Sequence, residues 1–188
     1  MSAPFLLRIP ISVIVTFALA LCLGASSVEA ATAGEITASS RSALRQIYLT
    51  NPNVRELGRH AQAVLVYPTI VKGGLFEGGE KGDGAVLDRH GAVTYCHTSA
   101  HSYGPQATEP AFGYAIFFVN RKDLAHLDAP GGWEPAKTPG VVVLDKAAAH
   151  SLDTAPAKRG IYAMFFNQRS LIGGLGLQGA KITRIHPR

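Results

Sequence analysis

The chain has 188 residues and a formal net charge of +5, and no run of lysine or arginine is longer than two residues. Scattered basic residues argue against a dedicated nucleic-acid-binding arm. A modest positive charge suits an anionic lipid surface or another acidic partner, and it also simply keeps an exported protein soluble.

The first 30 residues have the three parts of a secretory signal peptide. Residues 1–8 carry one basic side chain, residues 9–24 are apolar, and Val28 and Ala30 are the small residues that precede a cleavage site. We therefore expect a signal peptide over residues 1–30, export to the periplasm, and a mature domain over residues 31–188.

Two alternatives remain open for this segment. The apolar run approaches the length of a membrane span, which would make it an uncleaved anchor. Cys22 could instead carry a lipid, although Leu21 stands where a lipoprotein signal has a small residue. A lipoprotein anchored through Cys22 is therefore the second prediction for localisation.

We expect the mature chain to begin at Ala31, because cleavage follows the small residue Ala30. Sequencing the N-terminus of the protein from its native host checks this. A chain that begins with a diacylated Cys22 would make it a lipoprotein, and an intact Met1 would make it an anchored protein.

Residues 31–188 have the length of one ordinary domain with its own core, and no second domain fits comfortably. After cleavage Cys96 is the only cysteine, so no internal disulfide can form. Packing must therefore stabilise the domain.

Two helices are predicted at the start of this domain. Residues 36–49 have the periodicity of an amphipathic helix, and Asn51 can cap a second helix with Pro52 at its first position. The first helix has the apolar residues Ile36, Ala43, Leu44, Ile47 and Tyr48 on one face, and the second has Val54, Leu57 and Ala61.

From Ala63 onward, seven short runs rich in valine, isoleucine, tyrosine and phenylalanine predict strands. Parallel pairing needs long crossovers, and only residues 121–127 between these runs have a helical pattern. The predicted fold is α+β, with N-terminal helices packed on a curved antiparallel β-sheet or partial barrel.

Glycine-rich and metal-ligand motifs do not indicate a cofactor. Gly174, Gly176 and Gly179 match a dinucleotide-binding fingerprint, but a strand-like run follows where a helix is needed. His97 and His101 would share a strand face at roughly 13 Å, too far apart to bind one metal ion with Cys96. We predict neither a cofactor nor a metal.

No nucleophile elbow or catalytic triad signature is present in the sequence, so we predict that the protein is not an enzyme. Trp133 lies in a glycine-rich turn, and we expect its ring to cover an edge of the core rather than to meet a ligand.

Several blocks of this sequence resemble the SYLF domain. They are IYAMFFNQRSLIGGLGLQGAKITRIHP at residues 161–187, AVLVYPTIVKGGLFEGGEKGDGAVL at residues 63–87, FGYAIFFVN, and GGWE at residues 131–134. The resemblance extends over roughly residues 38–187. The family includes yeast actin-bundling endocytic proteins, animal phosphoinositide-binding proteins and short exported bacterial proteins.

The resemblance implies a non-enzymatic module that binds lipids or membrane surfaces, often through an N-terminal amphipathic helix. On this chain it implies that Arg41 and Arg45 meet anionic head groups, while Leu44, Ile47 and Tyr48 form the apolar side. The alternative is that the same stripe packs on the sheet.

A carrier or sensor that encloses a small apolar ligand between helices and sheet is the second predicted function. Residues 101–110 depart from the family pattern through Pro105 and Pro110, which we expect to shorten the strand there. Export would separate the protein from actin, so actin is not an expected partner.

Overall fold

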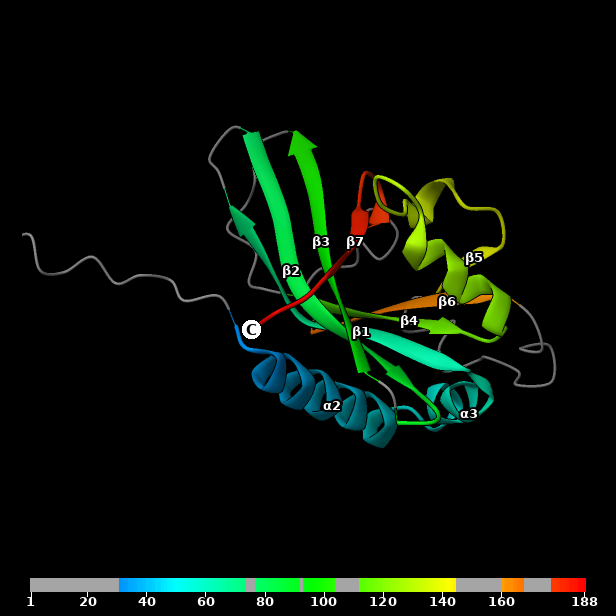
Figure 1. Cartoon of the computed structure of the whole chain (residues 1–188). Coiled ribbons are helices and arrows are strands. Elements are labelled where there is room, and N and C mark those ends of the chain that lie inside the picture. Colours follow the sequence, from blue (N-terminus) through cyan, green and yellow to red (C-terminus); the bar gives the residue numbers. More distant parts are fainter. Residues whose placement is uncertain (1–30, 74–76, 92, 104–111, 145–159, 168–176) are drawn as a thin grey trace, which may run out of the picture. The chain divides into compact units, whose positions relative to one another are not determined.

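The computed structural model describes residues 31–73, 77–91, 93–103, 112–144, 160–167 and 177–188. Two α-helices come first among these residues, followed by strands and two short 3-10 helices (Figure 1). The elements are α2 (Ala33–Thr50), α3 (Pro52–His60), β1 (Ala63–Gly73), β2 (Glu77–Asp88), β3 (Val93–Tyr103), β4 (Phe112–Phe118), η1 (Arg121–Asp128), η2 (Pro135–Lys137), β5 (Val141–Leu144), β6 (Ile161–Phe166) and β7 (Lys181–Ile185).

The strands form one open sheet in the order β5-β6-β4-β1-β2-β3-β7, which confirms the α+β class and the seven predicted strands. Every neighbouring pair is antiparallel except β5 and β6, which are parallel. The expectation of a wholly antiparallel sheet is therefore wrong at this pair. Residues 145–160 separate the two strands, which is enough chain for the crossover that parallel pairing needs.

Local capping explains where the two helices begin. Thr32 and Glu35 form a capping box at the start of α2, in which the amide of Thr32 donates to the Glu35 carboxylate at 2.8 Å. The side chain of Asn51 accepts from the Val54 amide at 3.1 Å, and Pro52 occupies the first position of α3. The predicted cap at Asn51 is confirmed.

The sheet separates two groups of buried side chains. The helices α2 and α3 cover one face, where Ile47, Val54 and Leu57 pack on residues of β1, β4 and β6. On the other face, Leu127 of η1 and Trp133 pack with those side chains of β1, β4 and β6 that point away from the helices. Figure 1 shows α2 and α3 on one side of the sheet and η1 on the other.

Trp133 covers the core, as predicted. Its side chain is 4% exposed, its ring centroid lies 5.6 Å from that of Phe118, and its indole N–H donates to Thr138 at 2.7 Å. The helix predicted at residues 121–127 is present as a 3-10 helix over residues 121–128.

Strand β1 contains one extra residue relative to both neighbours, close to Pro68. Its pairing with β2 shifts between Val66 and Val71, and its pairing with β4 shifts between Tyr67 and Ile70. Proline has no amide hydrogen to donate, so a bulge is the position in a central strand that tolerates it.

Ser40 anchors α2 to the sheet beside this bulge. Its hydroxyl donates to the carbonyl of Val66 at 3.0 Å and accepts from the amide of Ala85 at 3.3 Å, and the side chain is fully buried. One hydroxyl therefore satisfies backbone groups on both β1 and β2.

Replacing Ser40 with alanine should lower the free energy of unfolding by about 1–3 kcal/mol, because it removes the buried hydrogen bonds that its hydroxyl makes to Val66 and Ala85. Urea denaturation measures the change. The matched control is Ser39→Ala, because within the described residues the Ser39 hydroxyl bonds only to carbonyls of its own helix, and the residue is exposed. Equal losses in both variants would contradict the anchoring role.

Candidate functional site

A groove of about 350 Å³ lies where α2, α3 and the end of β2 meet. Its lining combines aliphatic and aromatic side chains with arginines, and no carboxylate is among the described residues that form it. The lining residues are Arg41, Leu44, Arg45, Tyr48, Leu49, Arg55 and Leu87. Four of the five residues predicted to bind lipid therefore lie together in one concave site.

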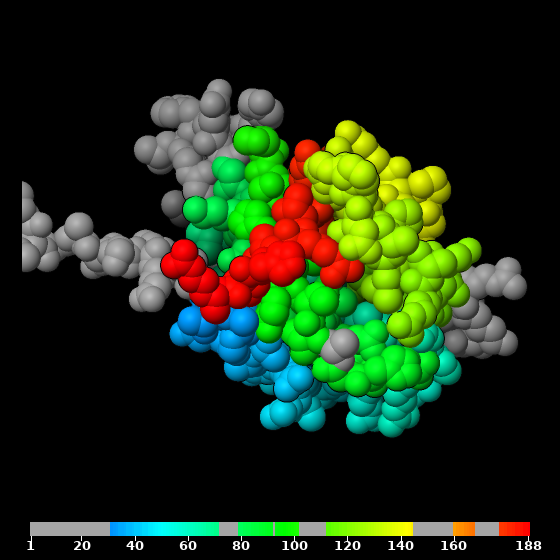
Figure 2. Space-filling model, viewed as in Figure 1, coloured from blue at the N-terminus to red at the C-terminus, as the bar shows by residue number. Residues whose placement is uncertain are grey.

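Helical spacing brings these side chains together. Arg41, Arg45 and Leu49 follow one another at intervals of four along α2, so they share one side of the helix. The turn at Asn51 brings α3 back beside α2, which places Arg55 at the same groove. Figure 2 shows α2 (blue) and α3 (teal) reaching the surface along the lower edge of this face.

The predicted residues differ in how accessible they are. Arg41 and Arg45 are exposed, whereas Leu44 and Tyr48 are half-buried against the core under the helices. Ile47 is only 3% exposed and belongs to that core, so it faces the sheet and does not line this groove. The apolar stripe of α2 thus packs largely on the sheet.

The sequence reasoning missed three groove residues. Leu49 is 71% exposed, the most exposed of the large apolar side chains described. Arg55 comes from α3 and Leu87 from β2. The four-residue spacing from Arg45 to Leu49 was visible in the sequence, but Arg55 and Leu87 join the groove only through the tertiary fold.

Tyr48 forms the boundary of the groove toward α3. A side-chain carbon at Gly58 would collide with the hydroxyl and ring of Tyr48, so the glycine allows the tyrosine to pack closely on α3. Burial raises the pKa of Tyr48 to about 12. The hydroxyl is therefore neutral at physiological pH.

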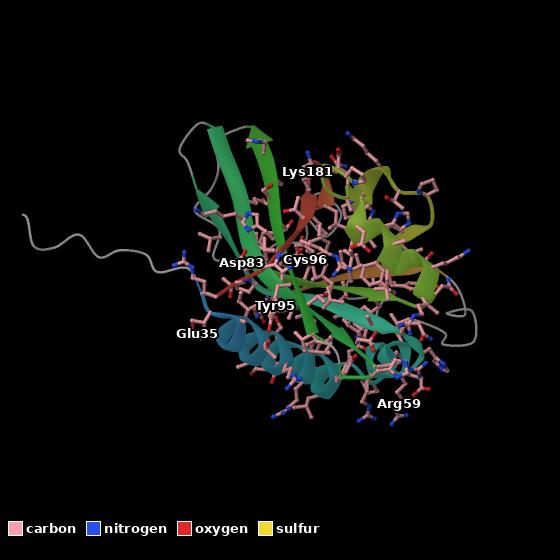
Figure 3. All side chains as sticks on the ribbon, viewed as in Figure 1. Glu35, Arg59, Asp83, Tyr95, Cys96 and Lys181 are labelled. Carbon is pink, nitrogen blue, oxygen red and sulfur yellow. The ribbon has the colours of Figure 1, made fainter. Side chains whose placement is uncertain are left out.

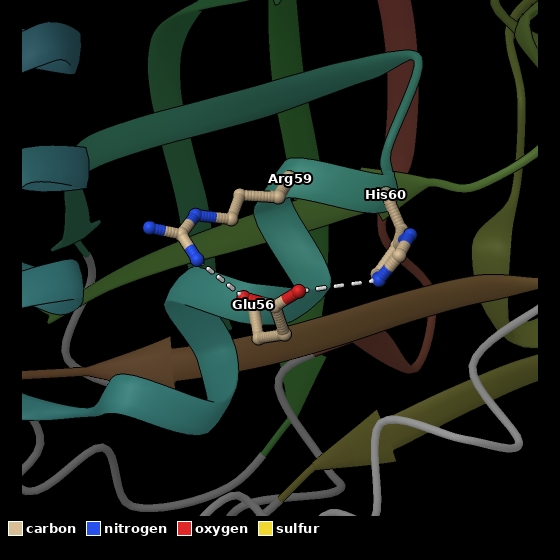
Figure 4. Close-up of polar contacts among 3 residues, drawn as sticks. All are labelled: Glu56, Arg59 and His60. Carbon is tan, nitrogen blue, oxygen red and sulfur yellow. Dashed lines mark hydrogen bonds and ion pairs between the residues drawn. The ribbon is translucent and has the colours of Figure 1, made fainter.

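Charge is unevenly neutralised on the two helices. Glu56 of α3 pairs with Arg59 at 2.8 Å and lies 3.3 Å from the Nε2 atom of His60 (Figure 4). Glu35, at the start of α2, is engaged in the capping box with Thr32. Figure 3 shows Glu35 near the N-terminus of α2 and Arg59 on α3.

Arg59 is neutralised by a carboxylate, and the three arginines of the groove differ from it. Within the described residues, no ion pair joins Arg41, Arg45 or Arg55 to a carboxylate. The groove is consequently a positively charged rim around an apolar floor. It suits a ligand that combines negative charge with hydrocarbon.

A second concave region, of about 410 Å³, lies between α2 and the end of β6. It is lined by α2 residues that include Gln46 and Thr50, and by Met164 and Phe166 of β6. Unlike the arginine-rimmed groove, it lies directly between helix and sheet, which is where the carrier alternative expects a ligand.

The residues Cys96, His97 and His101 do not form a metal site. Cys96 is fully buried on the sheet face away from the helices, whereas the Nδ1 atom of His97 lies 2.7 Å from the carboxylate of Asp83. His101 is exposed and pairs with Gly79 across the strands. Among the described residues no group of three metal-ligating side chains comes together.

Cys96 should make the free energy of unfolding fall as the pH rises through the alkaline range. Burial raises the pKa of this thiol from 9.0 to about 11, so the unfolded chain loses the proton first as the pH rises. The stabilisation is complete below pH 9.0 and is lost on the way to pH 11, with a size on the order of 3 kcal/mol. Urea denaturation across this range should show a shallower pH dependence for Cys96→Ala, and identical slopes would contradict the assignment.

Other predicted features fall outside the described residues. These are the signal peptide with Cys22, the glycines Gly174 and Gly176, and the prolines Pro105 and Pro110. Strand β7 comes directly after the turn at Gly179, as expected, in place of the helix that a dinucleotide-binding unit requires.

No known family model matches this sequence, and no curated protein matches it either. The resemblance to the SYLF domain therefore stays a prediction. Among the helices in the described ranges, none has the length and apolar character needed to cross a membrane.

Proposed function

We propose that this protein is an exported, non-enzymatic module of the SYLF type that binds anionic lipid at membrane surfaces through the groove between α2 and α3. The observation that carries the proposal is the trio Arg41, Arg45 and Arg55 around an apolar floor with no carboxylate in the lining. Anionic lipids are the expected partners, and neither nucleic acid nor actin is required.

The charges are sufficient for a reversible surface contact. A basic residue near an anionic membrane contributes about 1 kcal/mol, and the three groove arginines act together. Leu49 adds an exposed apolar side chain beside them. Because the stripe around Ile47 packs on the sheet, the helix meets the membrane through its arginine-bearing side while the fold stays intact.

A carrier that holds a small apolar ligand is the second candidate, because the region between α2 and β6 has a volume of about 410 Å³. That volume lies in the range of small-molecule sites, about 300–1,000 Å³. The lining includes Met164 and Phe165 beside polar groups such as Gln46. A carrier would hold its ligand during purification and respond little to salt.

Native mass spectrometry of the protein from its own host separates the two functions. A surface-binding module should be recovered without stoichiometric lipid and should bind anionic vesicles in a salt-dependent way. Recovery of a tightly held apolar molecule, retained at high salt, would favour the carrier.

A further inference from the structure

The groove between α2 and α3 has two chemically different parts. Its rim has arginines from both helices, and its floor has the side chains of Leu44, Tyr48, Leu49 and Leu87. A diffuse contact with a charged surface needs only the rim. An apolar floor beneath it matches a ligand with a hydrocarbon chain attached to the anionic group.

The rim has the chemistry of a phosphate site. Guanidinium groups form paired hydrogen bonds with phosphate oxygens, and a phosphate offers enough acceptors for more than one of them. Arg59, on the same helix as Arg55, is already neutralised by Glu56 at 2.8 Å. Among the described residues no carboxylate pairs with the groove arginines, so their charge remains for a ligand.

The groove has the size of a single-molecule site. Its volume of about 350 Å³ lies in the range of small-molecule pockets. Leu49 in its lining is 71% exposed, so a hydrocarbon chain lying in the groove would remove that apolar surface from water.

We infer that the groove binds one molecule of a membrane lipid, with its phosphate at Arg41, Arg45 and Arg55 and part of one acyl chain over Leu49 and Leu87. The inference rests on the proposed function, since it takes the partner to be an anionic membrane lipid. It adds a stoichiometry of one and a place for an acyl chain over Leu49 and Leu87, beside a phosphate held from both helices.

Calorimetric titration of the full chain with a short-chain phosphatidic acid, below its critical micelle concentration, tests the inference. We expect saturable binding of one lipid per chain. Arg55→Ala should weaken it about fivefold, the loss expected for one basic residue near an anionic head group. Leu49→Ser should weaken it about threefold or more, because apolar surface is no longer covered.

Two matched variants control for general effects. Arg59→Ala removes an arginine from the same helix that is already paired, and Val71→Ser removes an apolar side chain that is 52% exposed outside the groove. Both should bind the soluble lipid like the parent. Thermal melts establish that all four variants are folded.

The probes also separate this inference from the proposed function. Equal binding of short-chain phosphatidylcholine, of inorganic phosphate or of a free fatty acid would overturn the inference. The first has no net negative charge, the second has no hydrocarbon chain, and the third has no phosphate. Vesicle binding without saturable binding of the soluble lipid would overturn it while leaving the surface function intact. Soluble lipid binding without vesicle binding would support the groove and remove the surface function.

Discussion

The double variant Arg41→Glu, Arg45→Glu should lose binding to anionic vesicles at low salt. It replaces two attractive charges with two repulsive ones, and at about 1 kcal/mol per charge the loss amounts to about 4 kcal/mol. Both side chains are exposed and lie off the buried stripe of α2, so the fold should survive. Co-sedimentation with anionic vesicles measures the effect.

The matched control is Arg121→Glu, Lys122→Glu. These residues are exposed at the start of η1, and they change the net charge of the protein by the same amount. They lie outside the arginine-rimmed groove, on an element that covers the other face of the sheet. Equal losses in the two variants would show that overall charge rather than the groove drives binding.

Replacing Gly84 with valine should destabilise the fold by about 3 kcal/mol. The bulge of β1 lies so close to β2 here that a side-chain carbon at Gly84 would collide with the carbonyl oxygen of Val66 and lie 2.7 Å from the ring of Tyr67. Tyr67 is fully buried and cannot move aside easily. Urea denaturation of the variant measures the loss.

Gly79→Val is the control for this substitution, because it places the same residue in the same strand. Among the described residues, a side-chain carbon there would meet only the carbonyl oxygen of Ala100, at an ordinary 3.8 Å. We expect a change within about 1 kcal/mol, as β-propensity favours valine over glycine. A similar loss in both variants would mean that the close approach of the β1 bulge to β2 is not the cause.

Local signals predicted most of the fold. The cap at Asn51, the proline at position 52 and the apolar spacing of α2 and α3 act within a few residues, so they can be recognised in the sequence. The parallel pairing of β5 and β6 could not be predicted in this way. Which strand β5 pairs with, and in which direction, is a property of the tertiary fold and not of the short apolar runs themselves.

The candidate site could be predicted only in part. Arg41 and Arg45 can be recognised in the sequence from the polar side of α2. Which apolar side chains of α2 are buried depends on what the helix packs against. Ile47 therefore belongs to the core although it shares the apolar stripe with Leu44. Arg55 and Leu87 lie on other elements, and only the fold brings them to the groove.

The most direct test of the surface function is the binding of the unmodified protein to vesicles of different charge across a range of salt concentrations. We predict binding to anionic vesicles at low salt, progressive loss as salt screens the arginines, and little binding to zwitterionic vesicles. Equal binding to both kinds of vesicle, or no binding to either at low salt, would contradict the account.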